Sequence, residues 1–426
     1  MVNYANVSIW GTQVGSLFLD ENTGVISFEY TPEFVRSGLE LSPIFAPLRA
    51  GRVYSFAELP YQTYKGLPGF LADSLPDKFG DDLINQWLTR EGRAIGSYNA
   101  VERLLYQGSR AMGALTFEPA MRTELNQSVQ IELEGLIEAA LSVLNNREML
   151  NTNLNDGEDA LKTILRVGTS AGGSRAKAVV AYNKDTGEIK SGQVDAPEGF
   201  EHYLLKLDGV TNGSLGDPMF YGCIEYSYYR MALDCGIQMT DSFLLNDGKR
   251  RHFMTKRFDR EGGSKRLHMV TLCGMNHMDF NVPGAYSYEQ LFAVMRLLHL
   301  SRSEAEQAFR RMVFNIIGRN QDDHTKNFSF LMDTDGQWRL SPAYDMVYNY
   351  NRNGSYTNLH QMSVNGKRDA FSRADLLSIA ENIHLNNANS IIDGTIDVFS
   401  KMKHYMESDI PEEKIDRMYD NLRLNI

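Results

Sequence analysis

The sequence predicts an α+β protein with two lobes, the first rich in strands and the second mostly helical. Short alternating apolar segments separated by turns occupy the first part of the chain and return after a Gly/Ser-rich stretch. In the last third, apolar residues recur at helical spacing instead. With 426 residues, the chain is long enough to bury more than one core. We therefore expect an α/β subdomain at residues 1–118, a β-rich part of the first lobe at 119–258 and a helical lobe at 259–426.

The composition is that of an ordinary soluble protein with an acidic balance. Hydrophobic residues make up 42% and charged residues 23%, and the formal net charge is −11. A chain that binds nucleic acid by itself usually carries a basic face, so this charge argues against direct DNA or RNA binding. The three cysteines, Cys223, Cys235 and Cys273, have no C-x-x-C spacing and are typical of buried thiols in a reducing compartment. Because the N-terminus lacks a secretory pattern and no apolar run approaches about 18 residues, we expect a cytoplasmic protein that does not bind a membrane.

The N-terminal module is expected to form a sheet and helices. Strands, each bounded by turn residues, are expected at Val7–Trp10, Gln13–Leu19, Val25–Tyr30 and Ala114–Phe117. Apolar residues repeat at helical spacing over Phe79–Leu88, and Gly92 suits the end of that helix. A further helix is expected over Ser128–Asn145. This module carries no catalytic motif, so the chemistry is expected later in the chain.

A Gly/Ser-rich loop is the first candidate site, because its backbone suits a phosphate group. Residues 168–177 have the sequence GTSAGGSRAK and run directly into an apolar strand, Ala178–Tyr182. Glycines let the backbone curl so that successive amides point at one anion, and Lys177 adds a positive charge. The spacing matches neither Walker A nor G-x-G-x-x-G, so a hairpin tip that carries glycine is an equally good explanation of the loop alone.

A single lysine lies inside the apolar segment His202–Leu207. Lys206 is unfavourable in such a strand unless its charge is paired or used. The helix expected over Met219–Cys235 carries Glu225, which would be its acidic partner, as in kinases, where the lysine of such a pair contacts the α- and β-phosphates of ATP. The alternative is a lysine on an edge strand whose ammonium group reaches the solvent.

A hairpin over residues 243–255 then ends in Lys256, Arg257 and Phe258. In a kinase-like sheet this is the hinge to the second lobe, whose backbone would bond the adenine edge. In the alternative interpretation, Arg257 and Asp259 form an ordinary surface ion pair.

The most informative stretch is D-x-H-x-K-N, formed by Asp322, His324, Lys326 and Asn327. Asp345 follows after an expected hairpin whose apolar strands flank a D-T-D-G turn. Phosphoryl transfer needs a carboxylate that accepts the proton of the acceptor hydroxyl, an amide oxygen that binds Mg²⁺ and a second carboxylate that binds Mg²⁺. The distance in sequence from Asp322 to Asn327 equals that in the protein-kinase catalytic loop. A polar loop that only caps a helix is the alternative.

The sequence around this stretch predicts the helices that hold it. Ser287 with Gln290 and Ser303 with Glu306 are capping-box patterns, each of which begins a helix. The second helix delivers the chain to the D-x-H-x-K-N stretch and has an apolar face made of Phe309, Met312, Val313, Ile316 and Ile317. Beyond the hairpin, helices are expected at 371–380, 388–406 and 411–424. The order of elements is therefore that of a two-lobed, kinase-like fold.

Taken together, these motifs resemble those of the HipA family, the serine/threonine kinase toxins of bacterial type II toxin–antitoxin pairs. The likeness covers nearly the full length and rests on GLPGFLADSLPDKFG, GTSAGGSRAK, HYLLKLDG, KRFDR, D-x-H-x-K-N and S-P-x-Y-D in this order. The resemblance implies ATP and Mg²⁺ as cofactors, with Asp322 as the catalytic base and Asn327 and Asp345 as metal ligands. For ATP it implies contacts from Gly172, Gly173, Ser174, Arg175, Ala176, Lys177, Lys206, Lys256, Arg257, Phe258, His324, Tyr344 and Asp345. A purely structural role for His324 is an equal alternative.

The resemblance also implies a regulatory modification and partners. Family members autophosphorylate a serine of the Gly-rich loop, which is Ser170 in this sequence. They bind a small helix-turn-helix antitoxin that carries the toxin to operator DNA, and characterised members phosphorylate aminoacyl-tRNA synthetases. The sequence itself does not specify the protein substrate.

Two other functions remain open at this point. D-x-H-x-x-N also looks like the catalytic loop of phosphoinositide kinases, which implies a lipid or small-molecule kinase. No basic membrane-facing stretch supports a lipid substrate. The other alternative is a non-enzymatic corepressor that uses the kinase fold to bind proteins. The joint presence of Lys206, Asp322, Asn327 and Asp345 argues against it.

Overall fold

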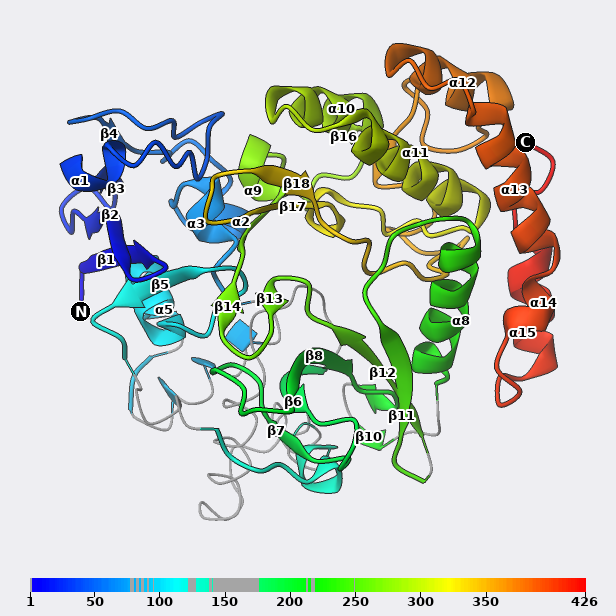
Figure 1. The fold of residues 1–426 in the computed structure, drawn as a ribbon, viewed down its shortest axis with the longest axis horizontal. Helices are drawn as coiled ribbons and strands as arrows, with labels where there is room; N and C mark the ends of the chain where they lie inside the picture. The colour runs from blue at the N-terminus through cyan, green and yellow to red at the C-terminus, as the bar shows by residue number, and fades with distance from the viewer. Residues whose placement is uncertain are drawn as a thin grey trace. The chain divides into compact units, whose positions relative to one another are not determined.

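The computed structural model describes residues 2–426 except 77–79, 82–83, 86–87, 90–91, 95, 122–127, 138–139, 141–175, 212–213, 216–218 and 249. The chain divides into two compact units (Figure 1). Unit 1 consists of Met1–Met219, Phe243–Met269 and Asp333–Gly336. Unit 2 consists of Phe220–Ser242, Val270–Met332 and Gln337–Ile426.

The N-terminal part of unit 1 is an antiparallel sheet with the strand order β4-β3-β2-β1-β5. Its strands are β1 (Tyr4–Ile9), β2 (Thr12–Leu19), β3 (Ile26–Tyr30), β4 (Val53–Tyr54) and β5 (Leu115–Glu118). The alternating pattern buries Val7, Leu17 and Phe28 on one face, which confirms the four strands expected here. At Gly15 the strands approach so closely that a Cβ atom would lie 2.2 Å from the carbonyl oxygen of Glu29.

The short helices of this part of the chain include α1 (Pro32–Val35), α2 (Tyr61–Tyr64), α3 (Gly69–Ala72) and α5 (Ala100–Gln107). Helix α5 begins with a capping box in which Asn99 and Glu102 bond each other's backbone amides. Half of the helix expected over residues 79–88 lies outside the described residues, and the described residues 80, 81, 84, 85 and 88 are helical. The helix expected from Ser128 begins later, at Leu133, because Gln130 instead pairs with Lys190 in a β-bridge; the end of that prediction lies outside the described residues.

The second sheet of unit 1 has the strand order β11-β12-β8-β6-β7. Its strands are β6 (Lys177–Tyr182), β7 (Ile189–Ser191), β8 (Glu201–Lys206), β11 (Ser242–Asn246) and β12 (Arg251–Lys256). A buried cluster that includes Tyr106, Leu136, Val180, Tyr203 and Leu205 packs on it. Two small hairpins complete the unit, β9 (Val210–Thr211) with β10 (Ser214–Leu215) and β13 (Arg260–Glu261) with β14 (Lys265–Arg266).

A buried carboxylate connects the N-terminal module of unit 1 to the chain that follows β12. Asp259 accepts hydrogen bonds from Arg257 Nη2 and Arg260 Nη1, both at 2.7 Å, and from the backbone N–H of Gly113 at 2.7 Å. The side chains of Arg257, Asp259 and Arg260 are 1%, 0% and 4% exposed. Burial by itself would raise the pKa of Asp259, but the two guanidinium groups outweigh it and hold this pKa well below its ordinary value. The surface ion pair considered from the sequence is therefore a buried one.

Unit 2 is mostly helical, with α8 (Tyr221–Asp234), α9 (Leu272–Asn276), α10 (Tyr288–Leu297), α11 (Arg302–Ile317), α12 (Arg373–Asn382), α13 (Ala388–Ser400), α14 (Met402–Tyr405) and α15 (Glu412–Asp420). The segment expected as one helix at 388–406 forms two, α13 and α14. Strands β17 (Ser329–Met332) and β18 (Trp338–Leu340) form the expected hairpin, and β15 (His268–Thr271) lies beside β17. Strands β16 (Tyr286–Ser287) and β19 (Met362–Ser363) pair in parallel.

Helix α11 is the central helix of unit 2, and it packs on α10, α12 and α13. Its predicted apolar face is buried from Ala308 to Ile317. The capping box predicted at Ser287 and Gln290 is confirmed at the start of α10. The one predicted at Ser303 is wrong, because Ser301 and Glu304 make the capping box and α11 begins two residues earlier.

The turn after α11 leads directly into the D-x-H-x-K-N stretch and is tightly packed. At Gly318, the C-cap of α11, a Cβ atom would lie 2.2 Å from the ring of Phe399 on α13. Tyr228 of α8 donates a hydrogen bond to the carbonyl oxygen of Gly318 at 2.8 Å. The position at which the chain leaves α11 is therefore fixed by two neighbouring helices.

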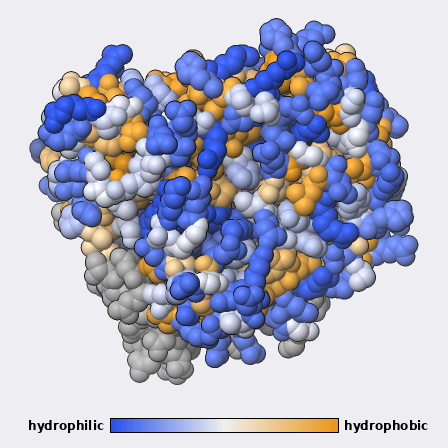
Figure 2. Space-filling model, viewed as in Figure 1, coloured by the Kyte–Doolittle hydropathy of each residue, from blue (hydrophilic) through white to orange (hydrophobic). Residues whose placement is uncertain are grey.

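Figure 2 shows hydrophilic residues over most of one face, with smaller hydrophobic areas between them. In the N-terminal sheet, Phe18 (55% exposed) and Val53 (57%) are exposed hydrophobic residues. Among the described residues, no helix combines the length and the apolar character needed to cross a bilayer.

We expect Asp259→Asn to destabilise the protein strongly, because it leaves two buried guanidinium groups without their anion. Breaking a buried ion pair from one side costs about 3–5 kcal/mol of unfolding free energy. The pKa of Asp259 is lower in the folded protein than in the unfolded chain. The ionised carboxylate therefore contributes its full share to the free energy of unfolding at neutral pH, and this share declines as the pH falls below the unfolded-chain pKa of about 4. Urea denaturation of the wild type and the variant measures the difference.

Glu261→Gln is the matched control, because it removes one carboxylate of the same region. Glu261 pairs with Lys265 at 2.6 Å, and these side chains are 42% and 58% exposed. Such an exposed pair contributes about 1 kcal/mol or less. Equal unfolding free energies for Asp259→Asn and Glu261→Gln would contradict the assigned role.

Candidate functional site

The segment of Asp345 lies beside the D-x-H-x-K-N stretch in unit 2. Asn320 and Asn349 form a parallel β-bridge, and the N–H of Gln321 donates to the carbonyl oxygen of Asn349 at 3.2 Å. The side-chain amide of Asn320 also donates to the backbone carbonyl of Asp345 at 3.2 Å. The hairpin β17–β18 thus returns the chain to the loop, as the sequence predicts.

Asp323, which the sequence does not single out, anchors the loop. Its side chain is fully buried and accepts three hydrogen bonds at 2.8 Å, from Tyr288 Oη, His360 Nδ1 and the backbone N–H of Gln361. Burial alone would raise the pKa of Asp323, but these donors outweigh it and lower the pKa. The loop is therefore fixed at a charged residue that lies directly between Asp322 and His324.

Asp322 and Asn327 are joined across the loop. The side-chain amide nitrogen of Asn327 donates to the backbone carbonyl of Asp322 at 2.8 Å. Asn327 ends a single 3₁₀ turn, η2 (Thr325–Asn327), and the hydroxyl of Thr325 donates to the carbonyl of Met278 at 2.6 Å. The Asp322 carboxylate accepts a hydrogen bond from Asn349 Nδ2 at 3.1 Å. These hydrogen bonds within and next to the loop fix the positions of Asp322 and Asn327.

Asp345 has a backbone conformation that is uncommon for a residue other than glycine, with φ of 53°. Asp tolerates this left-handed region better than most residues, and such outliers often occur at functional sites. Its carboxylate is close enough to His324 to act on the pKa of the imidazole. The structure therefore gathers Asp322, His324 and Asp345 in one region of unit 2.

His324 is a neutral residue at this site. Burial lowers its pKa to about 4, although the nearby Asp345 carboxylate acts in the opposite direction. Its Nε2 atom lies 3.8 Å from Asp322 Oδ1, too far for a hydrogen bond. Its Nδ1 atom is buried without a hydrogen-bond partner among the described residues. His324 also lines a cavity of about 10 Å³ together with Asp279 and Gln361. That cavity has about the size that one water molecule needs.

Tyr344 and Arg311 hold the backbone around the loop. The Tyr344 hydroxyl donates to the backbone carbonyl of Lys326 at 2.6 Å and also bonds the hydroxyl of Ser329. Arg311 is fully buried on α11 and donates from Nη2 to the carbonyl of Ser341 at 2.5 Å. Burial lowers the pKa of Arg311 to about 10, so it stays charged at neutral pH. The hydroxyl of Tyr344, predicted to contact ATP, is thus engaged with the loop itself.

In unit 1, the two predicted phosphate lysines are direct cross-strand partners. Lys177 on β6 pairs in register with Lys206 on β8, so both side chains leave the same face of the sheet. Lys177 is 7% exposed, and the ammonium group of Lys206 lies 5.8 Å from the ring centre of Phe253. Like charges at directly opposite positions are unfavourable, and an anion bound at this face would relieve the repulsion.

The predicted adenine segment is mostly engaged with the protein. Lys256 forms an ion pair with Glu201, and the Arg257 guanidinium is bound by Asp259. The backbone N–H of Arg257 donates to the carbonyl of His202 at 2.9 Å. Phe258 is half-buried. Adenine binding by this segment stays a prediction, and its remaining backbone groups would have to provide it.

Other predicted residues have more limited structural support. Ser170, Gly172, Gly173, Ser174 and Arg175 lie outside the described residues, and Ala176 is buried at the start of β6. Glu225 is 4% exposed on α8 of unit 2. Its pairing with Lys206 of unit 1 stays a prediction.

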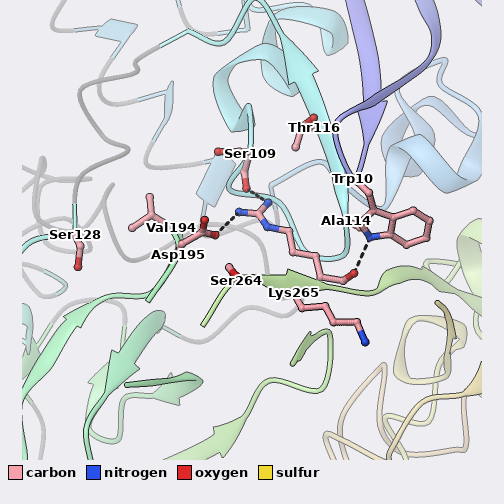
Figure 3. A pocket seen from close by; sticks show the side chains of 11 residues that line it. Trp10, Ser109, Ala114, Thr116, Ser128, Val194, Asp195, Ser264 and Lys265 are labelled. Carbon is pink, nitrogen blue, oxygen red and sulfur yellow. Dashed lines mark hydrogen bonds and ion pairs between the residues drawn. The ribbon is translucent and has the colours of Figure 1, made fainter. Parts of the chain in front are cut away.

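A larger cavity, of about 580 Å³, lies in unit 1 and is lined by none of the predicted site residues (Figure 3). Its wall includes Trp10 and Arg266. Trp10 Nε1 donates to the carbonyl of Arg266 at 2.7 Å, and Arg266 Nη1 donates to the carbonyl of Ser109 at 2.6 Å. These contacts join the N-terminal sheet to the β13–β14 hairpin, so Trp10 and Arg266 have a structural role in unit 1.

The donor set in unit 2 fits Mg²⁺. Because the amide nitrogen of Asn327 bonds the loop, its amide oxygen is the atom that would bind a metal. In the described part of the chain there is no cluster of three or more His, Cys, Asp or Glu side chains suited to a metal. Proteins usually bind Mg²⁺ through one or two carboxylates together with water and substrate phosphates, and Asp345 would supply such a carboxylate.

The chain matches the models of two consecutive protein-family domains. The HipA N-terminal domain matches residues 5–118, and the HipA-like C-terminal domain matches residues 169–404. The second match alone covers more than half of the chain.

Individual relatives agree with these matches. The serine/threonine-protein kinase toxin HipA of Shewanella oneidensis is 23% identical over 363 residues, covering 78% of this chain and 72% of that protein. A Haemophilus influenzae protein provisionally named a kinase is 30% identical over 173 residues, covering 37% of this chain. The chain spans about half of that relative, 48% of its length.

The fold is shared with a solved structure. HipA in the complex of Shewanella oneidensis HipA, HipB and operator DNA has a TM-score of 0.68 to this chain at 18% identity, covering 98% of this chain and 94% of that one. The α+β, two-lobed kinase-like fold is thus confirmed, and the predicted enzyme class agrees with the names of the relatives. Because both family domains match in order and the fold agrees over almost the whole length, this chain belongs to the HipA family.

Proposed function

We propose that this chain is an ATP- and Mg²⁺-dependent serine/threonine protein kinase of the HipA type. The observation that carries the proposal is the loop anchored at Asp323, which presents Asp322 and Asn327 next to the segment of Asp345. A base, an amide oxygen and a carboxylate are the groups that phosphoryl transfer requires. Membership of the HipA family supports the same activity.

In the proposed reaction, Asp322 accepts the proton of a serine or threonine hydroxyl. The hydroxyl oxygen forms a bond to the γ-phosphorus, the bond from that phosphorus to the bridging oxygen breaks, and ADP leaves. Asn349 holds the carboxylate of Asp322 through a hydrogen bond at 3.1 Å, which limits its rotation. Bound Mg²⁺, held by Asn327 and Asp345, supplies neutralisation of phosphate charge. Lys177 and Lys206 are proposed to bind the phosphates from the sheet of unit 1.

We further propose that the acceptor is a protein of translation, such as an aminoacyl-tRNA synthetase, and that a HipB-like helix-turn-helix antitoxin neutralises the kinase. The related Shewanella oneidensis complex contains HipA, HipB and operator DNA, which supports a partner of this kind. With a net charge of −11, the chain itself suits DNA contact only through a basic partner.

Asp322→Asn tests the function directly, and we expect it to abolish phosphoryl transfer while the fold and ATP binding survive. The two side chains are nearly equal in size, so packing is preserved, but the amide accepts no proton. Transfer of labelled phosphate from γ-labelled ATP to the protein or a model substrate measures activity, and calorimetry with a non-hydrolysable ATP analogue measures binding.

Asp345→Asn is the matched comparison, because it makes the same change of charge in the same region. It should instead weaken Mg²⁺-dependent ATP binding. Wild-type transfer rates in folded Asp322→Asn protein would rule out Asp322 as the base.

Autophosphorylation at Ser170 is a second expectation, and we expect it to lower ATP affinity sharply. A phosphoryl group adds roughly −1.5 to −2 charges at the start of the loop proposed to hold the ATP phosphates, and like charges there repel. Peptide mapping after incubation with Mg²⁺ and ATP locates the phosphate, and binding assays compare the two forms.

Ser170→Ala should then acquire no phosphate, whereas Thr169→Ala, which changes the neighbouring hydroxyl residue and none of the residues expected to contact ATP, should still be modified at Ser170. A phosphorylated form that binds ATP as tightly as the unmodified form would exclude this switch.

A further inference from the structure

A chain of buried polar side chains runs from the segment after α15 to the D-x-H-x-K-N stretch. Arg423 Nη1 donates to His360 Nε2 at 2.8 Å, and His360 Nδ1 donates to Asp323 Oδ2 at 2.8 Å. The side chains of His360 and Asp323 are completely buried, and that of Arg423 is 9% exposed. All three belong to unit 2.

The hydrogen bonds determine the state of His360. A carboxylate can only accept, so Nδ1 carries the proton and donates it to Asp323. A guanidinium group can only donate, so Nε2 carries no proton and accepts from Arg423. The imidazole is therefore neutral, and burial of His360, which lowers its pKa, acts in the same direction. In this tautomer, one ring nitrogen of His360 bonds Arg423 and the other bonds Asp323, so the position of Arg423 restricts that of the Asp323 carboxylate.

Arg423 is itself held firmly in place. Its Nη1 atom donates to the carbonyl of Ile316 at 2.9 Å, and its backbone N–H donates to the carbonyl of Ile317 at 3.1 Å. The guanidinium also pairs with Asp369 and lies 5.2 Å from the ring centre of Phe371. It therefore fixes the imidazole of His360 relative to the end of α11.

We propose that Arg423 is a positioning residue for catalysis, which acts through His360 and Asp323 on the orientation of Asp322. This inference rests on the proposed kinase function. Arg423 reaches the two neighbours of Asp322 by different routes: through His360 to Asp323 with hydrogen bonds of 2.8 Å, and directly from Nη2 to Gln321 Oε1 at the longer distance of 3.4 Å. The route with the shorter hydrogen bonds passes through Asp323, so we assign the main effect to it. The segment after the last helix thereby becomes part of the support of the catalytic loop.

Arg423→Gln tests this role, with Arg417→Gln as the matched control. Arg417 lies on α15 and pairs with Glu413 at 3.0 Å, with side chains 72% and 88% exposed, so the control makes the same change of charge at the surface. We expect Arg423→Gln to lower kcat about tenfold or more, the size of effect typical of residues that orient a catalytic group, with the KM for ATP nearly unchanged. Arg417→Gln should match the wild type, and Arg423→Lys should retain part of the activity.

A double-variant comparison separates positioning from a general loss of stability. In His360→Asn, the amide nitrogen can replace Nδ1 as the donor to Asp323, but the shorter side chain has no atom at the position of Nε2 to accept from Arg423. If Arg423 acts through His360, adding Arg423→Gln to His360→Asn should lower kcat little further. Fully multiplicative losses would overturn the proposal, as would equal kcat values for Arg423→Gln and Arg417→Gln.

Hydrogen exchange gives a readout that does not depend on activity. We expect the amides of residues 321–327 to exchange faster in Arg423→Gln than in Arg417→Gln, because the loop loses its fixed support. Unchanged protection of this loop would overturn the positioning role. If the wild type transfers no phosphate at all, the proposed function fails, and the exchange comparison alone then decides the role of Arg423.

Discussion

The buried carboxylate of Asp323 is the constraint on which the catalytic stretch depends. A charged group without solvent is tolerated only when hydrogen bonds replace its water, and Asp323 receives them from Tyr288, His360 and the backbone of Gln361. These donors come from α10 and from the segment before β19, so one side chain ties two distant parts of unit 2 to the loop. The position of Asp322 follows from this arrangement, because it directly precedes Asp323 in the chain.

Unit 1 uses the same physical principle with different donors. Asp259 is equally buried, but its partners include two arginines, so the cluster carries excess positive charge inside the unit. It connects the N-terminal module to the chain after β12 through the backbone of Gly113. At Asp323 the direct donors are neutral, and the positive charge of Arg423 acts through an imidazole. The Asp259 cluster attaches the N-terminal module to the chain after β12. The hydrogen bonds from Arg423 through His360 instead fix the orientation of the Asp323 carboxylate.

The sequence predicts the fold class well, and it predicts the hairpin that brings the segment of Asp345 back beside the D-x-H-x-K-N stretch, because both signals are local. The chemical roles of the site residues stay predictions. Spacing identifies the D-x-H-x-K-N stretch, and apolar strands with a turn identify the hairpin behind it. The sequence does not identify Asp323 as a buried residue, because its neighbours are all polar. Buried and half-buried residues alternate along this loop, but no apolar side chain marks the buried positions. Its partner His360 is remote in sequence and carries no motif. The start of α11 shows a further limit, since Ser301 and Ser303 both fit a capping box and only tertiary packing decides between them.

The most direct test of this account is the rate of phosphoryl transfer in Asp323→Asn at saturating ATP, measured on protein shown to be folded. The variant keeps Asp322, Asn327 and Asp345, removes the charge of Asp323 and replaces one of its two accepting oxygens by an amide nitrogen that can only donate. If Asp323 positions the base, transfer should fall about tenfold or more, while binding of Mg²⁺ and an ATP analogue changes little. Transfer at the wild-type rate would contradict the account, because the loop would then be positioned without the buried carboxylate.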